Sequence, residues 1–322
     1  MNIPMHRMRG RAALCLAAAA FALPCAAVQA APLAGERYFP NVPLTTQDGR
    51  QVRFYDDLVK GKAVAVNIIY TSCTDVCPLE TARLAEVQRL IGAHAGKDLH
   101  FYSISIDPAR DTPQVLKAYA KKFKADPDWL FLTGKKEDIQ LLTSKLGLSR
   151  ASDAISKDGH ASSLMLGSDA TGQWMRNSAV DNPAFLAATM ANFFGWDDVV
   201  PTVDYARAAP LAIGKARFLF DSKCASCHTI GGGDRIGPDL AGVTGRRSPA
   251  WLARYLREPD KVLAEGDPAA QALFERYDKV NMPNLNLGTE DVSALLAYLA
   301  APPPAARTAL QDRPSKKHQH HH

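Results

Sequence analysis

The cysteines constrain this chain more than any other feature. The sequence has six, and the four that follow residue 30 form two short motifs, Cys73-Thr-Asp-Val-Cys77 and Cys224-Ala-Ser-Cys227-His228. No cysteine is left for a structural bridge between distant segments. In Cys-x-x-Cys-His, two thiols can add to the vinyl groups of a c-type haem while the adjacent imidazole reaches the iron. We therefore expect a redox or metal site in each half of the chain.

The first thirty residues have the composition of an export signal. Three arginines precede an uncharged, alanine-rich stretch at 12–23, and the small residues near position 30 suit a signal peptidase. We predict that residues 1–30 are a signal peptide and that the mature protein is periplasmic. An uncleaved anchor, giving membrane association, is the alternative, because residues 12–31 carry no charge and are about long enough to span a bilayer.

The charge distribution does not favour a nucleic-acid partner. The formal net charge is +5, but three of the positive charges are arginines of the predicted signal, and others lie after Ala301. The region between is close to neutral, so we expect no basic surface for phosphate backbones. Residues 302–322 are proline-rich, then basic, and end in histidines. We predict a disordered His-rich tail, either an incomplete purification tag or a weak metal-collecting segment.

Strand and helix signals alternate in the first half of the chain. The apolar runs at 63–70 and 99–106 predict buried parallel strands, and the helical spacing over 78–93 predicts the crossover between them. Local signals then indicate helix starts at Thr112-Pro113 and Asn182-Pro183. Gly147 indicates the end of a helix, and residues 162–175 indicate a hairpin. We therefore predict an α/β domain over residues 31–200.

The second half has a different pattern. Residues 201–210 include two prolines and show no periodicity, which predicts a linker. The remainder, 211–301, is helical and loop-rich. We predict amphipathic helices over 211–222 and from Thr289 onward, with the hydroxyl of Thr289 capping the second. The expected architecture is an α/β domain followed by an all-α domain.

The second cysteine motif is best explained by covalent haem. A zinc site would need two more ligands, and 211–301 contains no other cysteine and no histidine besides His228. His228 can bind one axial position of the iron. Met282, in the loop Asn281-Met-Pro-Asn284, is the candidate for the other, because thioether ligation closes the iron to small molecules and raises its potential.

This half of the chain resembles the class I cytochromes c. The resemblance rests on Phe220-x-x-x-Cys224-x-x-Cys227-His228, Ile236-Gly-Pro-Asp-Leu240 and Met282-Pro283. It implies one haem c attached through Cys224 and Cys227, ligated by His228 and Met282, with electron transfer to a redox partner rather than catalysis at the iron. It also implies that Pro238 orients His228.

The first motif predicts a site for a soft metal ion or a dithiol. Cys73 and Cys77 follow the strand that ends at Tyr70, and residues four apart share a helix face, so they can form a disulfide or bind one ion. Two thiolates favour Cu(I), and a third ligand, an imidazole, would also permit Cu(II). The candidate imidazoles in this domain are His94, His100 and His160, of which His160 is the one in a loop.

Residues 39–194 resemble the Sco family of copper chaperones. The matching segments are Thr71-Ser-Cys73-Thr-Asp-Val-Cys77-Pro78, then Ser105-Ile-Asp-Pro-Ala-Arg-Asp-Thr-Pro113 with the residues to Tyr119, and His160. The resemblance implies a thioredoxin-like fold, one copper ion bound by Cys73, Cys77 and His160, and help in building the copper centre of respiratory oxidases. Gly159 separates His160 from Asp158, which the family histidine commonly follows directly. Asp75 and Asp107 are expected to be solvated or structural.

Three functions remain open from the residues. The preferred one is a metallochaperone that delivers Cu(I) to an oxidase subunit or another periplasmic copper protein, with the haem exchanging single electrons. The second is a thiol-disulfide oxidoreductase, in which Cys73 and Cys77 are catalytic and the haem accepts or donates electrons. The third is electron transfer alone, with the first domain as a docking or sensing module.

Overall fold

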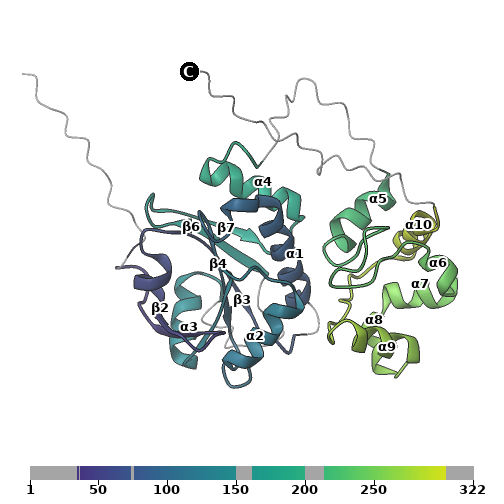
Figure 1. Ribbon diagram of the computed structural model, residues 1–322, viewed down its shortest axis with the longest axis horizontal. Coiled ribbons are helices and arrows are strands. Elements are labelled where there is room, and N and C mark those ends of the chain that lie inside the picture. Colours follow the sequence, from purple (N-terminus) through teal and green to yellow (C-terminus); the bar gives the residue numbers. More distant parts are fainter. Residues whose placement is uncertain (1–34, 36, 74–75, 150–161, 200–213, 302–322) are drawn as a thin grey trace, which may run out of the picture. The chain divides into compact units, whose positions relative to one another are not determined.

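The computed structural model describes residues 35, 37–73, 76–149, 162–199 and 214–301. The N-terminal region is built on a seven-stranded mixed sheet with the order β2-β1-β5-β4-β3-β6-β7 (Figure 1). Its strands are β1 (Pro43–Thr46), β2 (Gln51–Arg53), β3 (Ala63–Ile69), β4 (His100–Ser105), β5 (Leu130–Gly134), β6 (Ser163–Ser168) and β7 (Gln173–Ser178).

The centre of this sheet is a parallel βαβ unit followed by an antiparallel ββα unit. β3 and β4 are parallel, with Val64 opposite His100, and α1 (Val76–Ile91) connects them. On its other side β3 is antiparallel to β6, which forms a hairpin with β7 and leads into α4 (Pro183–Phe194). This is a thioredoxin-like arrangement, as predicted. β5 extends it in parallel, and the β1–β2 hairpin adds the far edge.

Helices cover both faces of the sheet, which explains why β3 is apolar except for the buried Asn67. Val64, Val66 and Ile68 of β3 lie in a core with Ile139 and Leu142 of α3 (Lys136–Lys145). Ala65 and Ile69 of β3 lie in a second core with apolar side chains of α1, α2 (Pro113–Lys122) and α4. Burial on both faces is the normal environment of parallel strands.

The predicted helix boundaries of this region are confirmed. The hydroxyl of Thr112 accepts a hydrogen bond from Val115 N–H at the start of α2, and Asn182 accepts from Ala184 and Phe185 at the start of α4. Gly147, just beyond α3, has φ of +67°, which favours glycine. The strands β1, β2 and β5 were not predicted, because runs of three to five residues give little periodicity.

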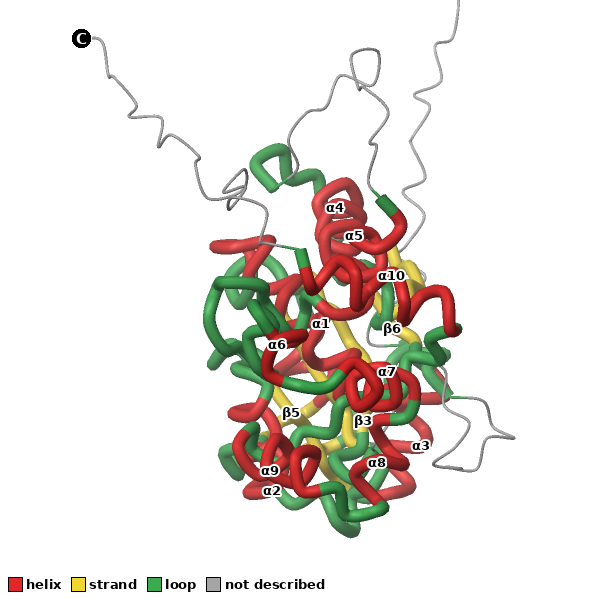
Figure 2. Tube along the Cα trace, turned by 90° about the vertical axis from the view of Figure 1, so that its right-hand side faces the viewer, coloured by secondary structure: helices red, strands yellow, loops and turns green. Residues whose placement is uncertain are grey.

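The C-terminal region is helical, as predicted. Residues 214–301, all of which the structure describes, contain helices joined by long loops and no strand (Figure 2). The helices are α5 (Lys215–Leu219), α6 (Val243–Arg246), α7 (Pro249–Arg257), α8 (Pro259–Ala264), α9 (Pro268–Arg276) and α10 (Thr289–Ala300). Leu219 and Phe220 pack with Leu295 and Leu299 of α10 in the core of this region.

Two details of the helix predictions were wrong. The helix expected over 211–222 is α5, which ends at Leu219 and continues as a wider π-type turn, Phe220–Cys224. Thr289 does not cap α10, because it is already the first helical residue and Gly288 holds the cap position without a side-chain bond. The short helices α6 to α9 were not predicted.

No helix within the described ranges is both long and apolar enough to cross a membrane. The predicted signal peptide or anchor at 1–30, the linker at 201–210 and the tail at 302–322 lie outside those ranges.

Candidate metal and haem sites

The first cysteine pair lies beyond the carboxyl end of β3. Cys73 is held in a turn by a hydrogen bond of 3.2 Å from its N–H to the carbonyl of Tyr70, and Cys77 is in the first turn of α1. The N–H of Cys77 donates to Sγ of Cys73 at 3.4 Å. Both side chains are buried, with 7% and 0% exposed. The structure therefore brings the two predicted sulfur ligands together at the edge where α/β sheets place functional groups.

The two sulfurs of this pair are not equivalent. A hydrogen bond with Cys73 and burial raise the pKa of the Cys77 thiol well above its ordinary value. The N–H bond to Sγ of Cys73 stabilises negative charge on that sulfur, because a hydrogen bond to the charged form favours it. A negative charge on the pair is therefore better stabilised on Cys73 than on Cys77.

Glu80 was not predicted as part of this site. It lies one turn of α1 beyond Cys77 and is 1% exposed, and burial raises the pKa of its carboxyl to about 8. Its Oε1 has no hydrogen-bond partner among the described residues. A neutral carboxyl therefore lies close to both cysteines near neutral pH. No local pattern marks it, because its position on α1 is that of an ordinary helix residue.

Asp111 is the second residue that the sequence analysis missed. Its side chain is 0% exposed and accepts hydrogen bonds from the backbone N–H of Thr71 at 3.1 Å and from the Thr71 hydroxyl at 2.5 Å. The hydroxyl of Ser105, the last residue of β4, donates to the same carboxylate at 2.5 Å. The signal for Asp111 was present in the segment Asp107-Pro-Ala-Arg-Asp111, which the resemblance included without assigning it a role.

The predicted third copper ligand cannot be placed. His160 and Asp75 lie outside the described residues. Among those that are described, no cluster of three or more His, Cys, Asp or Glu side chains has the spacing of a metal site. His94 is engaged elsewhere: its ring nitrogens contact Asp98 at 2.7 Å and Asp198 at 2.9 Å, and the ring stacks on Trp196. The backbone N–H of Asp107 donates to Ser105 Oγ at 3.1 Å, and the solvated or structural role expected for its carboxylate stays a prediction.

The four residues predicted to hold the haem all line one cavity of about 960 Å³ in the C-terminal region. Cys224, Cys227 and His228 come from the turn after α5, whereas Met282 comes from the loop before α10. All four residues lie between positions 224 and 282, so a single small domain supplies the whole set. Burial raises the pKa of the Cys224 thiol to about 11, so that sulfur is a neutral thiol before any thioether forms.

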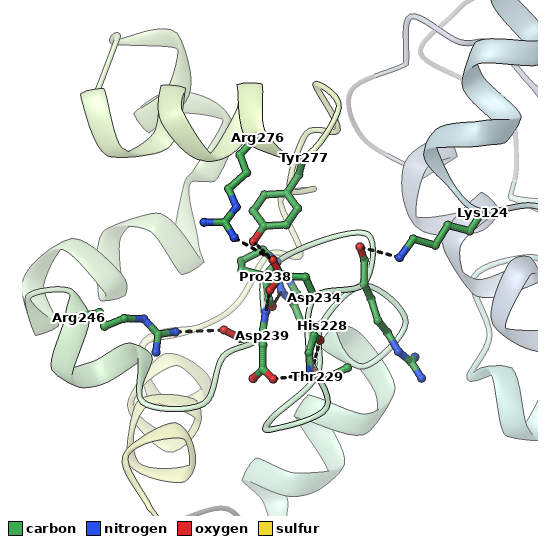
Figure 3. A network of polar contacts seen from close by, with 11 residues as sticks. Lys124, His228, Thr229, Asp234, Pro238, Asp239, Arg246, Arg276 and Tyr277 are labelled. Carbon is green, nitrogen blue, oxygen red and sulfur yellow. Dashed lines mark hydrogen bonds and ion pairs between the residues drawn. The ribbon is translucent and has the colours of Figure 1, made fainter.

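A loop network orients His228 (Figure 3). Its Nδ1 lies 2.9 Å from the carbonyl oxygen of Pro238, which leaves Nε2 as the nitrogen for a metal. A Cβ on Gly237 would lie 2.6 Å from the imidazole, so only glycine fits there. The carboxylate of Asp239 accepts from the N–H groups of Gly231 and Gly233, which ties the glycine loop to this segment.

The cavity fits a haem by its residues as well as its size. Its volume lies within the range of pockets that enclose a cofactor. Apolar side chains make most of its wall. Arg246 and Arg247 offer hydrogen-bond donors for the two carboxylates of a haem, whereas Arg276, which also lines the cavity, is paired with Asp234. Oδ1 of Asn281 is buried on this wall without a partner among the described residues, as expected where a ligand group is to be met.

Two family models match the chain. The first, described as SCO1/SenC, matches residues 33–193, and the second, described as Cytochrome c, matches residues 212–301. The chain is 36% identical over 116 residues to a "Putative copper-binding protein" of Stutzerimonas stutzeri, covering 35% of this chain and 53% of that protein. It is 35% identical over 89 residues to the "SCO1 protein homolog" of Bacillus subtilis, 27% of this chain and 45% of that protein.

The chain spans about half the length of the curated relatives that it matches. Among solved structures, it resembles Arabidopsis thaliana ScoI with copper bound, with a TM-score of 0.40 and 24% identity over 48% of this chain and 96% of that one. It also resembles a SCO1/SenC family lipoprotein of Bacillus anthracis, with a TM-score of 0.41 and 29% identity over 48% and 93%.

Proposed function

Since this chain belongs to the SCO1/SenC family and has a cytochrome c domain after the family region, we propose that it is an exported copper chaperone with a fused one-electron carrier. Its cargo is Cu(I), and its recipient is the copper-binding subunit of a respiratory oxidase or another periplasmic copper protein. Both families typically work outside the cytoplasm, which agrees with the proposed signal at 1–30. A signal that stays uncleaved would anchor the protein to the membrane.

The observation that carries this proposal is the contact between Cys77 N–H and Sγ of Cys73 in a buried turn. Two buried thiols that hydrogen-bond to each other within one apolar cluster suit Cu(I), which prefers soft ligands and low coordination numbers. His160 is proposed as the third ligand. Delivery then consists of ligand exchange, in which thiolates of the recipient replace Cys73, Cys77 and His160 one at a time.

Competition for Cu(I) tests this assignment. The reduced, copper-free protein is expected to take one Cu(I) per chain from a moderate chelator. Cys73→Ser and Cys77→Ser should each abolish that uptake, because one thiolate and the imidazole of His160 bind Cu(I) too weakly to compete with the chelator. His160→Ala should weaken it but leave binding measurable. Full uptake by both serine variants would contradict the proposal.

The cytochrome c domain implies a haem, and we propose that Cys224 and Cys227 hold it covalently while His228 and Met282 are its axial ligands. When bound, the haem supplies reversible one-electron transfer. The chain's own groups determine how it is held: Pro238 accepts from the ring of His228 and fixes its orientation, and apolar residues exclude water. Loss of the Met282 thioether, as in Met282→Ala, should lower the haem potential and admit small ligands to the iron.

We propose that the haem sets the redox state of the copper or of the cysteine pair. Oxidation of Cu(I) releases one electron, the number that one haem accepts, whereas closure of the Cys73–Cys77 dithiol releases two electrons and two protons. Electrons are expected to pass from dithiol to haem, because protein dithiols have lower potentials than His/Met haems in general.

A second function, thiol-disulfide exchange, is favoured by the unequal sulfurs of the pair. Charge on Cys73 suits it to attack a partner disulfide, releasing one partner thiolate and forming a mixed disulfide. Cys77 then attacks Cys73, which closes the internal disulfide and releases the second partner thiol. A disulfide-reductase assay on copper-free protein separates the two functions. A dedicated chaperone should be nearly inactive, and Cys77→Ser should trap the mixed disulfide of a reductase.

A further inference from the structure

We propose that Asp111 is a positioning residue for the cysteine site, holding Cys73 at the place where it meets Cys77. The inference rests on the proposed function, since it concerns the site that binds Cu(I). Asp111 does not touch the metal in this proposal. It acts through Thr71, two positions before Cys73 in the same loop.

The contacts of the carboxylate come from two different segments. Thr71 donates both its N–H and its hydroxyl, at 3.1 and 2.5 Å, from the loop after β3. Ser105 donates its hydroxyl at 2.5 Å from the last position of β4. Because Ile69 and Ser105 are partners in the parallel register, the two strands end side by side there. Asp111 therefore ties the start of the cysteine loop to the end of the neighbouring strand.

Asp111 is itself rigidly placed. Its backbone N–H donates to the carbonyl of Asp107 at 2.9 Å, and the next residue, Thr112, caps α2. No ion pair among the described residues includes Asp111. A fully buried carboxylate is costly unless hydrogen bonds compensate for the lost water, and three donors do so here. Most of that compensation comes from the loop that leads to Cys73.

Thr71 and Cys73 lie in the same short turn, so a restraint on Thr71 also restrains Sγ of Cys73. Cys73 N–H donates to the carbonyl of Tyr70, so residues 70–73 form one turn with Thr71 inside it. If Thr71 moves, the turn and Sγ of Cys73 move with it, and the bond from Cys77 N–H at 3.4 Å is altered. Loss of the Asp111 contacts should therefore misplace one of the two proposed copper ligands.

Two serines of β4 provide a matched test. Ser103 and Ser105 are both 0% exposed, but Ser105 bonds Asp111, whereas Ser103 bonds Asn67 and Trp129. In reduced full-length protein, Ser105→Ala, Thr71→Val and Asp111→Ala are each expected to weaken Cu(I) affinity about ten- to hundredfold. Ser103→Ala should keep wild-type affinity even if its unfolding midpoint falls as far as that of Ser105→Ala. Asp111→Asn, which can keep all three contacts by donating to the Thr71 hydroxyl, should recover most of the affinity.

A second readout separates this proposal from the chaperone function. The alkylation rate of Cys73, measured by mass spectrometry in copper-free protein, should change in Ser105→Ala and Thr71→Val but not in Ser103→Ala. If wild-type protein binds no Cu(I), the chaperone function fails, and the alkylation rates still test the positioning role. The positioning role would be overturned if folded Ser105→Ala and Thr71→Val kept wild-type Cu(I) affinity and wild-type Cys73 reactivity. It would also be overturned if Ser103→Ala lost as much Cu(I) affinity as Ser105→Ala.

Discussion

At the scale of single residues, the cysteine site depends on polar groups that carry no ligand role. Glu80 and Asp111 are both buried carboxyl groups, but their surroundings differ. Three donors converge on Asp111, whereas Oε1 of Glu80 has no partner among the described residues. Burial raises the pKa of Glu80 and outweighs the side-chain hydrogen bonds with Ser162 and Asn67, which favour the charged form. The two buried carboxyl groups therefore differ in how many donors reach them, and Glu80 is expected to be largely neutral near neutral pH.

Glu80 should make the stability of the N-terminal domain depend on pH. Burial raises its pKa to about 8 in the folded state, from 4.5 in the unfolded chain. Between these values the folded state binds the extra proton, so stability is full below the lower value and falls as pH rises toward the upper one. The slope should approach roughly 1.4 kcal/mol per pH unit. Denaturant unfolding of copper-free protein at several pH values measures it.

Glu80→Gln is expected to remove that slope and to be more stable than the wild type at pH 8. Glu137→Gln, at an exposed position in the first turn of α3, is the matched control and should keep it. Parallel pH profiles for wild type and Glu80→Gln would show that Glu80 is charged throughout and that its surroundings stabilise the carboxylate.

Gly237 should be essential for seating His228. An added Cβ would lie 2.6 Å from Cε1 and 2.9 Å from Nδ1 of the imidazole, so Gly237→Ala must displace the ring or the loop. Overpacking of this kind costs about 1–3 kcal/mol. We expect a lower thermal midpoint of the haem domain and a smaller low-spin absorbance signal. Gly245→Ala, where nothing lies within 4 Å of the new methyl, should behave as wild type. Unchanged spectra in Gly237→Ala would mean that the loop can shift to accommodate the methyl group without displacing His228.

At the scale of elements, the residue at which a helix starts determines which hydroxyl group can cap it. Ser248 precedes α7 and accepts from Trp251 N–H at 3.2 Å, which is the capping geometry. Thr289 has the same chemistry, but it lies inside α10 and caps nothing. A cap satisfies one of the N–H groups that a helix leaves free at its first turn. The two residues therefore look alike in sequence and differ in structure by a single helix position.

Ser248→Ala and Thr289→Ala make a matched comparison of these two positions. Loss of the Ser248 cap should destabilise the C-terminal domain by about 1 kcal/mol, whereas Thr289→Ala should change its stability little. Denaturant unfolding followed by haem absorbance reports on this domain alone. A larger loss in Thr289→Ala than in Ser248→Ala would contradict the assigned start of α10.

At the scale of the whole molecule, sequence predicted architecture better than site detail. The periodic segments at 63–70 and 78–93 correspond to β3 and α1, Cys73 and Cys77 lie in contact, and Cys224, Cys227 and His228 line one cavity. Short strands and helices were missed because their periodicity is too brief to detect. Glu80 and Asp111 were missed for a different reason: their importance comes from contacts across the sheet edge, which no local pattern records.

Electron counting tests the molecule as a unit. In copper-free protein with reduced cysteines and oxidised haem, we expect one disulfide for every two haems reduced, because the dithiol loses two electrons. With one Cu(I) per chain, one haem should be reduced per copper oxidised. Haem absorbance and thiol titration measure both ratios. Cys73→Ser should stop both reactions, whereas haem reduction that persists in this variant would show another electron source.

The place of β3 in the sheet also affects how the chain reaches its native state. Its neighbours are β4, which follows soon after it, and β6, whose Ser168 pairs with Ala63. β3 and β6 are far apart in the sequence, so they pair slowly, because the entropy cost of closing the long loop comes before the favourable free energy of their contacts. During synthesis or translocation, one edge of β3 stays open until β6 has emerged. A nascent chain stopped before that point would offer this apolar edge for aggregation, so a holdase would be most useful in that interval.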